Sequence, residues 1–315
     1  MADFQERVVK IKVIGVGGAG NNVINRMIEA GVGGVDFIVV NTDKQDLNKS
    51  VCKNKVQIGE KLTNGMGAGS KPEIGQKSAE ESRAQIAKIL EGTDMVFITA
   101  GMGGGTGTGA APIVADLAHE AGILTVGVVT KPFKFEGANR MRQAESGIAD
   151  DVLKQAVTSI SELVGYSDRV IINLDFADVS AVMKNAGRAH MGVGIAHGRE
   201  MAEQAALNAV ASPLLETSIN GATGVLVNVT GSPELTLDDV ETAANIVQEA
   251  ASPDANIIFG ATYSDEFEDA MRVTVIATGF EQRSEEDQPK VDEAGKPAKI
   301  TDNSDIDDIF SIFNR

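Results

Sequence analysis

A glycine-rich segment at residues 101–109 carries the most distinctive chemistry in this sequence. It reads Gly-Met-Gly-Gly-Gly-Thr-Gly-Thr-Gly and connects an apolar run at 95–99 to a helix-like segment at 112–118. Glycine lacks a Cβ atom and tolerates positive φ angles, so successive backbone N–H groups can turn toward one point where a helix begins. The helix dipole and the hydroxyls of Thr106 and Thr108 favour negative charge at that point, which predicts a phosphate chain as the ligand. A flexible linker is the alternative, but a linker is not expected between a buried strand and an apolar helix.

A second glycine turn, Gly-x-Gly-x-x-Gly at 15–20, follows the β-branched run at 8–16. It matches the dinucleotide-binding fingerprint, and Asp43 ends the next predicted strand, where a ribose-binding acid would lie. A dinucleotide fold does not require the richer segment at 101–109, however, and the sequence has no Gly-Lys-[Ser/Thr] phosphate-binding motif. Two glycine turns at one sheet edge therefore predict a single nucleotide with a long phosphate chain, held by backbone N–H groups.

Hydrophobic periodicity indicates the elements that position these turns. In the first half of the chain, strand-like runs alternate with helix-like segments, with strands predicted at 8–16, 35–40, 56–58, 95–99 and 123–129 and a helix at 72–90. This alternation predicts a parallel sheet covered on both faces, with ligands at the carboxyl ends of its strands. A second, smaller α/β lobe is predicted from strands at 170–172, 224–230, 255–262 and 272–278 and helices at 198–210 and 235–250. An amphipathic helix at 150–164 is expected to join the two lobes.

The charge balance restricts the partners of this chain. Its formal net charge of −17 would repel nucleic acid and anionic membrane surfaces, so neither is expected as a direct partner. The single cysteine, Cys52, rules out an internal disulfide and fits a reducing cytoplasm. No apolar run is long enough to span a bilayer, so direct membrane insertion is not expected. Residues 281–305 are typical of a disordered acidic linker, and the apolar tail at 306–315 is typical of a peptide that orders on a partner.

Four charged residues outside the glycine turns are candidates for binding or catalysis. Glu136 and Arg140 follow the fifth predicted strand, where a carboxylate could accept hydrogen bonds from ribose and a guanidinium could meet phosphate. A solvated charged turn is the alternative for both. Asp175 and Asp178 stand three residues apart at the start of a helix-like segment, and this spacing alone favours a helix N-cap, worth about 1 kcal/mol. The three histidines have no metal-ligand spacing, so no metal site is predicted from them.

Five motifs taken together resemble the FtsZ family of bacterial cell-division proteins, which are relatives of tubulin. The motifs lie at 15–22, 41–43, 101–109, 131–137 and 173–179, within a similarity that spans residues 8–280. The resemblance implies an α/β fold in which a parallel, Rossmann-like GTPase sheet is joined by a central helix to a smaller α/β domain with a mixed sheet. It implies a division into a GTP-binding domain at 8–148, the second half of the central helix at 149–165, a C-terminal GTPase-activating domain at 166–280, a disordered linker at 281–305 and a partner-binding peptide at 306–315.

The same resemblance implies a GTPase that binds GTP or GDP with Mg²⁺. Its protomers would associate head to tail into cytoplasmic filaments that form the division ring at midcell. The C-terminal peptide would bind membrane-anchor and regulatory division proteins. The family's nucleotide-binding residues can be carried over by position. The nucleotide would contact Gly18, Ala19, Gly20, Asn21 and Asn22, and its phosphates would contact Gly105, Thr106 and Gly107. Glu136 and Arg140 would contact the ribose region, and Asp150 would contact the guanine.

The resemblance also implies a catalytic role for the loop at 173–178. In this family the matching loop enters the nucleotide site of the next protomer, where its acids position and polarise the attacking water. Asn173, Asp175 and Asp178 would have that role here. Each active site would then consist of residues from two chains, and such a heterologous contact propagates as a filament.

One departure from the family pattern opens an alternative function. Between Ile148 and Ala149 the resemblance implies a further internal segment, with a sheet strand, a loop and the first half of the central helix. A chain without that segment could be a non-hydrolysing binding protein that co-assembles with or caps an intact homologue. A nicotinamide-dependent oxidoreductase remains a third hypothesis, which rests on the fingerprint at 15–20 alone.

Overall fold

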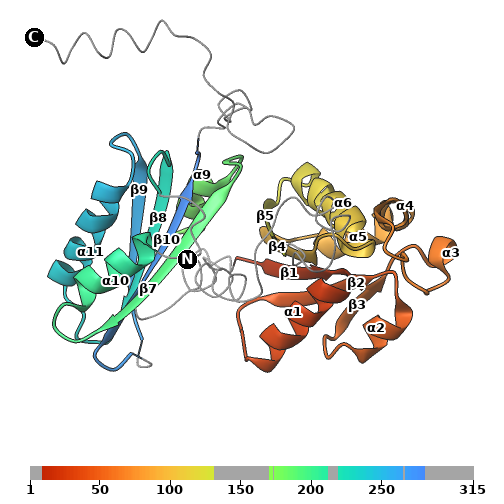
Figure 1. Ribbon diagram of the computed structural model, residues 1–315, viewed down its shortest axis with the longest axis horizontal. Helices are drawn as coiled ribbons and strands as arrows, with labels where there is room; N and C mark the ends of the chain where they lie inside the picture. The colour runs from red at the N-terminus through yellow and green to blue at the C-terminus, as the bar shows by residue number, and fades with distance from the viewer. Residues whose placement is uncertain (1–8, 131–169, 173, 212–218, 265–266, 281–315) are drawn as a thin grey trace, which may run out of the picture. The chain divides into compact units, whose positions relative to one another are not determined.

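The computed structural model describes residues 9–130, 170–172, 174–211, 219–264 and 267–280 (Figure 1). Within these ranges the chain forms two five-stranded sheets, each with its own helices. The predictions for Glu136, Arg140, Asp150 and Asn173 lie outside the described residues, as do those for the central helix at 149–165, the linker and the C-terminal peptide.

The first sheet is parallel throughout and has the strand order β3-β2-β1-β4-β5. Its elements are β1 (Ile11–Val16), α1 (Gly17–Glu29), β2 (Asp36–Asn41), α2 (Lys44–Lys49), β3 (Asn54–Gln57), α3 (Glu60–Thr63), α4 (Pro72–Glu81), α5 (Arg83–Leu90), β4 (Met95–Gly101), α6 (Thr106–Glu120) and β5 (Leu124–Thr130). Helices α1 and α2 lie on one face of this sheet, and α4, α5 and α6 lie on the other (Figure 1).

Apolar side chains on both faces of the central strands explain this three-layer arrangement. Toward α1, the fully buried Val13 and Phe97 pack with Ile24. Toward α6, Ile14 and Ile98 pack with helix residues such as Val114. Burying a side chain of this size stabilises the fold by about 1.5–3 kcal/mol. Strands that are apolar on both faces are stable only between two helix layers, which is why the run of apolar residues predicted a covered parallel sheet.

The second sheet is mixed and has the order β6-β9-β8-β10-β7. Its elements are β6 (Val170–Ile172), α9 (Phe176–Met183), β7 (Ala189–His197), α10 (Met201–Val210), β8 (Gly224–Gly231), α11 (Leu237–Ala250), β9 (Asn256–Tyr263) and β10 (Ala270–Thr278). Strands β8 and β9 are parallel, whereas the other three pairings are antiparallel. Helices α10 and α11 cover one face of this sheet, and α9 packs against β8 on the other. The predicted fold class, α/β with a parallel first sheet and a second domain with a mixed sheet, is confirmed.

Two predicted details differ from the structure. The helix expected at 72–90 is two helices, because Ser82 leaves helical geometry with φ −103° and ψ 16° and its hydroxyl accepts a hydrogen bond from Gly59 N–H (3.0 Å). Strand β7 was not predicted from the sequence, since Gly192 and Gly194 weaken its strand pattern. Gly194 is required by packing: a Cβ there would overlap the Ala205 carbonyl oxygen on α10. Among the described helices, none has the length and apolarity needed to cross a membrane.

Candidate functional site

The two glycine turns lie at the topological switch point of the first sheet. The chain runs outward from β1 to β2 and β3, and then returns to β4, which pairs with the other side of β1. The first turn follows β1 and leads into α1, and the second follows β4 and leads into α6. Because β1 and β4 are parallel neighbours, both turns are at the same carboxyl edge. In open α/β sheets this is the place where ligands bind.

The backbones of the two turns are in direct contact, which confirms the predicted convergence. A Cβ added at Gly17, where φ is +75°, would lie 2.9 Å from Gly107 N. One added at Gly101 would lie 2.5 Å from the Cβ of Ala19, and one added at Gly20 would overlap the Thr99 carbonyl oxygen. Glycine is therefore required at these positions because no other residue allows the two chain segments to approach so closely.

Helices α1 and α6 both begin without a side-chain cap and without an acidic residue in the first turn. In α6 the N–H of Gly109 donates to Gly105 O (3.1 Å), so the amides of Thr106, Gly107 and Thr108 precede the regular helical hydrogen bonds. The N-terminal amides of a helix carry a partial positive charge. Two such helix starts in contact form a cradle of backbone donors that suits an anion with several oxygens.

Polar side chains behind the cradle hold its shape. In the amide orientation that satisfies both ends of its side chain, the buried Asn21 donates to the carbonyl oxygens of Gly15 (3.0 Å) and Gly17 (3.1 Å) and accepts from Asn41 Nδ2 (3.2 Å). Asn41 also donates to Asp46 Oδ2 (3.0 Å). The first turn is thus fixed to the end of β2 before any ligand arrives.

Three further polar residues connect the second turn to the strand ends. The hydroxyls of Thr42 and Thr106 are 2.6 Å apart, which joins the end of β2 to the start of α6. Thr108 Oγ1 accepts a hydrogen bond from Gly103 N–H (2.9 Å), which closes the glycine-rich segment on itself. Asn41 and Thr42 belong to a predicted motif, but their bracing roles were not predicted because they depend on contacts between distant segments.

A third glycine-containing segment, at 65–71, borders the second turn. A Cβ added at Gly105 would lie 2.8 Å from Ala68 Cβ and 2.9 Å from Lys71 N. Helix α4 continues this contact, since a Cβ at Gly75 would overlap Gly105 O and one at Gly109 would overlap Pro72 O. The starts of α4 and α6 therefore touch along their backbones, and the cradle has three walls.

The structure places the predicted nucleotide-binding residues as follows. In the first turn Gly18, Ala19 and Asn22 are exposed, whereas Gly20 and Asn21 are buried. In the second turn Gly105 and Gly107 are buried and Thr106 is half-buried. All eight belong to the two segments that meet at the switch point, and the side chain of Asn21 braces the turn from within.

Asp43 has a different role from the one that a dinucleotide site would give it. Its Oδ1 accepts hydrogen bonds from Gln45 N–H (2.8 Å) and Asp46 N–H (3.1 Å) and so caps helix α2. This N-cap accounts for an acid at the end of β2 without a ribose. Asp43 therefore adds no support to the nicotinamide hypothesis, which rests on the glycine fingerprint at 15–20.

The two candidate catalytic aspartates begin helix α9. Asp175 Oδ1 accepts from Asp178 N–H (2.9 Å), and Asp178 Oδ2 accepts from Asp175 N–H (3.2 Å), which makes a complete capping box. The N-cap interpretation of their spacing is confirmed. Asp175 is exposed and Asp178 is half-buried, so both carboxylates are at a surface, and each uses one oxygen for the cap.

Cysteine and metal chemistry have little support among the described residues. Cys52 is 2% exposed, and burial raises the pKa of its thiol, which donates to the carbonyl oxygen of Phe37 (3.3 Å). A buried thiol of this kind is a poor nucleophile. Within the described ranges no group of three or more His, Cys, Asp or Glu side chains could hold a metal ion.

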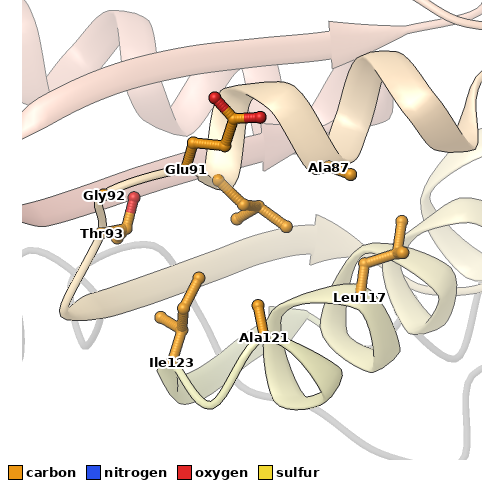
Figure 2. Close-up of a pocket in the computed structure, with 8 residues that line it drawn as sticks. Ala87, Glu91, Gly92, Thr93, Leu117, Ala121 and Ile123 are labelled. Carbon is orange, nitrogen blue, oxygen red and sulfur yellow. The ribbon is translucent and has the colours of Figure 1, made fainter.

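A small cavity of about 150 Å³ lies away from the glycine turns (Figure 2). Thr93 and Ile123, which line it, lie in the loops just before β4 and β5, so the cavity is at the opposite edge of the sheet from the cradle. The remaining lining residues come from the last turns of α5 and α6 and the loops that follow them: Ala87, Leu90, Glu91, Gly92, Leu117 and Ala121. The chemistry predicted from the sequence therefore does not involve this cavity.

A doubly wound parallel sheet with uncapped helix starts meeting at its switch point defines an α/β protein built to bind the phosphates of a nucleotide. Comparison with known families matches residues 10–174 to the tubulin/FtsZ family GTPase domain and residues 187–281 to the FtsZ family C-terminal domain. The chain belongs to the tubulin/FtsZ family.

Solved structures agree with this assignment. An empty FtsZ dimer from M. jannaschii is 40% identical, with a TM-score of 0.78 over 87% of this chain and 89% of the other. A mutant FtsZ from the same organism is 39% identical, with a TM-score of 0.75 over 86% and 91% of the two chains. A GDP-bound CetZ1 monomer from Haloferax volcanii shares the fold at 21% identity, with a TM-score of 0.68 over 86% and 94%.

Proposed function

We propose that this protein binds and hydrolyses GTP and polymerises head to tail into cytoskeletal filaments that form the cell-division ring. The observation that carries the proposal is the contact between the uncapped starts of α1 and α6, marked by Gly17 and Gly107. Backbone donors from two helices at one point suit a chain of phosphates better than a single anion. Membership of a GTPase family with FtsZ structures at about 40% identity supports guanine nucleotide as the ligand.

The cradle supports specific roles for the residues that line it. The amides of Gly105, Thr106 and Gly107 would bind the phosphates, together with those of the first turn at 18–22. In the proposed site Glu136 and Arg140 meet the ribose region and Asp150 meets the guanine, as the family resemblance implies. Mg²⁺ would be held largely by phosphate and water oxygens, since it keeps several waters and needs few protein ligands, and it would neutralise phosphate charge.

Hydrolysis is proposed to need a second protomer. Asp175 and Asp178 each use one carboxylate oxygen in the capping box, which leaves Asp175 Oδ2 and Asp178 Oδ1 able to accept a proton from a water molecule. The cap fixes the orientation of both side chains at the surface. With Asn173, they would enter the nucleotide cradle of the next protomer and position the attacking water. The M. jannaschii FtsZ structure is a dimer, which supports self-association.

The decisive experiment uses two capping boxes of the same design. Asp178→Ala removes the acid at the third position of α9 and its hydrogen bond to the N-cap amide, and Asp239→Ala removes the equivalent acid and bond from α11. We expect Asp178→Ala to slow GTP hydrolysis at least about 100-fold, while the Kd for GTP, measured by calorimetry, stays unchanged. Asp239→Ala should lose stability alone. Parallel loss of GTP binding in Asp178→Ala would refute the catalytic role.

Two further measurements test the shared site. Phosphate release per protomer should fall steeply on dilution, and activity strictly proportional to protein concentration down to high dilution would contradict a site built by two chains. Mixing Asp178→Ala with Gly107→Ala, a variant expected to lose the cradle, should restore part of the activity. The nucleotide of the first variant then meets an intact Asp178 of the second.

A second candidate function rests on the edge of the first sheet. Among the described residues β5 pairs with β4 only, and the resemblance implies one more sheet strand between Ile148 and Ala149. A chain that lacks this segment would bind an intact homologue without hydrolysing GTP. Sedimentation with GTP separates the two functions. If the chain only binds a homologue, it should not pellet by itself, but it should change how much of the intact homologue pellets.

Cell-level features complete the proposal. The protein would act in the cytoplasm at midcell, and the peptide at 306–315 would bind a membrane anchor and regulatory division proteins. The bacterial source remains a prediction. So do the domain divisions at residues 148, 165, 280 and 305. A fluorescent fusion with and without residues 306–315 tests the role of the peptide: the truncated protein should still form filaments but lose its membrane-proximal ring.

A further inference from the structure

Within the part of the chain that the structure describes, strand β5 has an unprotected edge. Among the described residues it pairs with β4 on one side only, over all seven of its positions. Its sequence, Leu-Thr-Val-Gly-Val-Val-Thr at 124–130, contains no charged residue and no proline. Soluble proteins normally blunt such an edge with charge, proline, a bulge or shortness, because unpaired N–H and C=O groups recruit other strands.

The opposite edge of the same sheet shows that protection. Strand β3 has four residues, and Asn54 and Lys55 on it are exposed. In the second sheet β6 has three residues. The long edge strand β7 has one of its carbonyl oxygens, that of Ile195, occupied by Asn208 Nδ2 of α10 (3.4 Å). In the described ranges β5 has none of these forms of protection.

Gly127, at the centre of β5, has no structural explanation within the described chain. A Cβ added there would meet nothing within 4 Å, and its φ is not in the left-handed region. Glycine inside a strand is destabilising compared with other residues. Gly127 is the one exposed residue of β5, and the residues on either side of it are half-buried.

The sequence of β5 is self-complementary about Gly127. In an antiparallel pairing of two copies with Gly127 opposite Gly127, Val126 faces Val128, and Thr125 faces Val129. Pairs of β-branched residues on one face of a sheet are stabilising. Val126 and Val128 also pack on the α1 side of the sheet, so the pairing keeps each face in register.

We infer that the β5 edge is an interface between two copies of this chain, related by a two-fold axis at Gly127. The two parallel sheets then form one continuous ten-stranded sheet. This contact runs along a strand and uses no residue of the nucleotide cradle, so it is independent of GTP and of the proposed head-to-tail contact. It adds a symmetric, lateral association to a chain otherwise proposed to grow in one direction.

Opposite charges at the axis test the geometry. In the nucleotide-free full chain, sedimentation equilibrium should show dimers for the wild type and for Gly127→Ala, in which a methyl group enters open space. Gly127→Lys and Gly127→Glu should each weaken the dimer at least about tenfold, because like charges then face each other. A mixture of these two variants should restore dimers, which also shows that both fold.

Cross-linking gives an independent test. Opposite residues of an antiparallel pair have Cα atoms about 4.5–5.5 Å apart, a separation that suits a disulfide. Gly127→Cys should therefore form a covalent dimer under mild oxidation, while the wild type should not, because its Cys52 is buried. A monomeric wild type would overturn the inference. Dimers that persist in Gly127→Lys alone would overturn it as well.

Discussion

Two pairs of helices begin in opposite ways. On the first sheet, α1 and α6 start without a side-chain cap and without an acid in the first turn. On the second sheet, α9 and α11 start with complete capping boxes, Asp175 with Asp178 and Thr236 with Asp239. Capping is the usual way to satisfy the free amides at a helix start. Its absence where two helix starts touch leaves these amides free to bind a ligand, whereas α9 and α11 satisfy theirs with side chains.

The largest expected effect comes from closing the cradle. In Gly107→Ala the added Cβ would lie 2.6 Å from Gly101 O and must displace the start of α6 from the end of β4. We expect GTP affinity to fall at least about 100-fold, or about 3 kcal/mol. Gly33→Ala, where a Cβ meets nothing within 4 Å, is the matched control. Calorimetric titration with GTP measures both, and equal affinities would show that the amides of the turns do not bind the nucleotide.

Giving α1 the acidic first turn of α9 and α11 should have a smaller effect. Ala19 is exposed in the first turn of α1, and Ala19→Asp would stabilise the empty helix start through its dipole while repelling phosphate. GTP affinity should fall about tenfold, less at high salt because the repulsion is screened. Ala19→Asn has the same size without charge and should retain most of the affinity. A salt-independent loss shared by both variants would point to size instead of charge.

Removing a cap from the second sheet should change stability and leave GTP binding unaffected. Thr236 Oγ1 accepts from Asp239 N–H (3.2 Å) at the start of α11. Thr236→Ala should lower the free energy of unfolding by about 1 kcal/mol, measured by urea denaturation. Thr242→Ala, an exposed site in the body of the same helix, should have little effect. A change in GTP affinity would show that the two kinds of helix start are not functionally separate.

The smallest effect is expected from the hydroxyl contact between Thr42 and Thr106 (2.6 Å). A double-mutant cycle with Thr42→Val and Thr106→Val should give a coupling of about 1 kcal/mol in the unfolding of the nucleotide-free protein. The same cycle on GTP affinity separates bracing from binding. If Thr106 binds phosphate directly, its single variant should lose more affinity than Thr42→Val does.

The sequence predicted the first sheet and the meeting of its turns for a physical reason. Buried parallel strands need apolar residues on both faces, and glycine is forced where two backbones touch, so both leave local signals. The spacing of Asp175 and Asp178 likewise revealed a cap, since a capping box depends on residues three apart. These features are encoded within a few neighbouring residues.

Features that depend on distant contacts were not predictable. Gly194 of strand β7 is required because α10 packs directly on it, and this contact between the helix and the strand is not visible in the local pattern. The break at Ser82 depends on the amide of Gly59, 23 residues earlier in the chain. The bracing of Gly15 and Gly17 by Asn21 requires the end of β2. In each case the local structure is determined by tertiary contacts, which the propensities of neighbouring residues do not reveal.

The backbone contact between α4 and α6 has a mechanical consequence. At Gly75 and Gly109 no side chain separates the two helices, so no compressible layer can absorb a displacement of one relative to the other. They must shift together as a rigid unit. Because α6 has 15 residues and is about 22 Å long, a movement at its first turn reaches the far rim of the sheet, where Leu117 and Ala121 border the hollow in Figure 2. A displacement of the start of α6 would thus be carried along the helix to the edge of the sheet opposite the glycine turns.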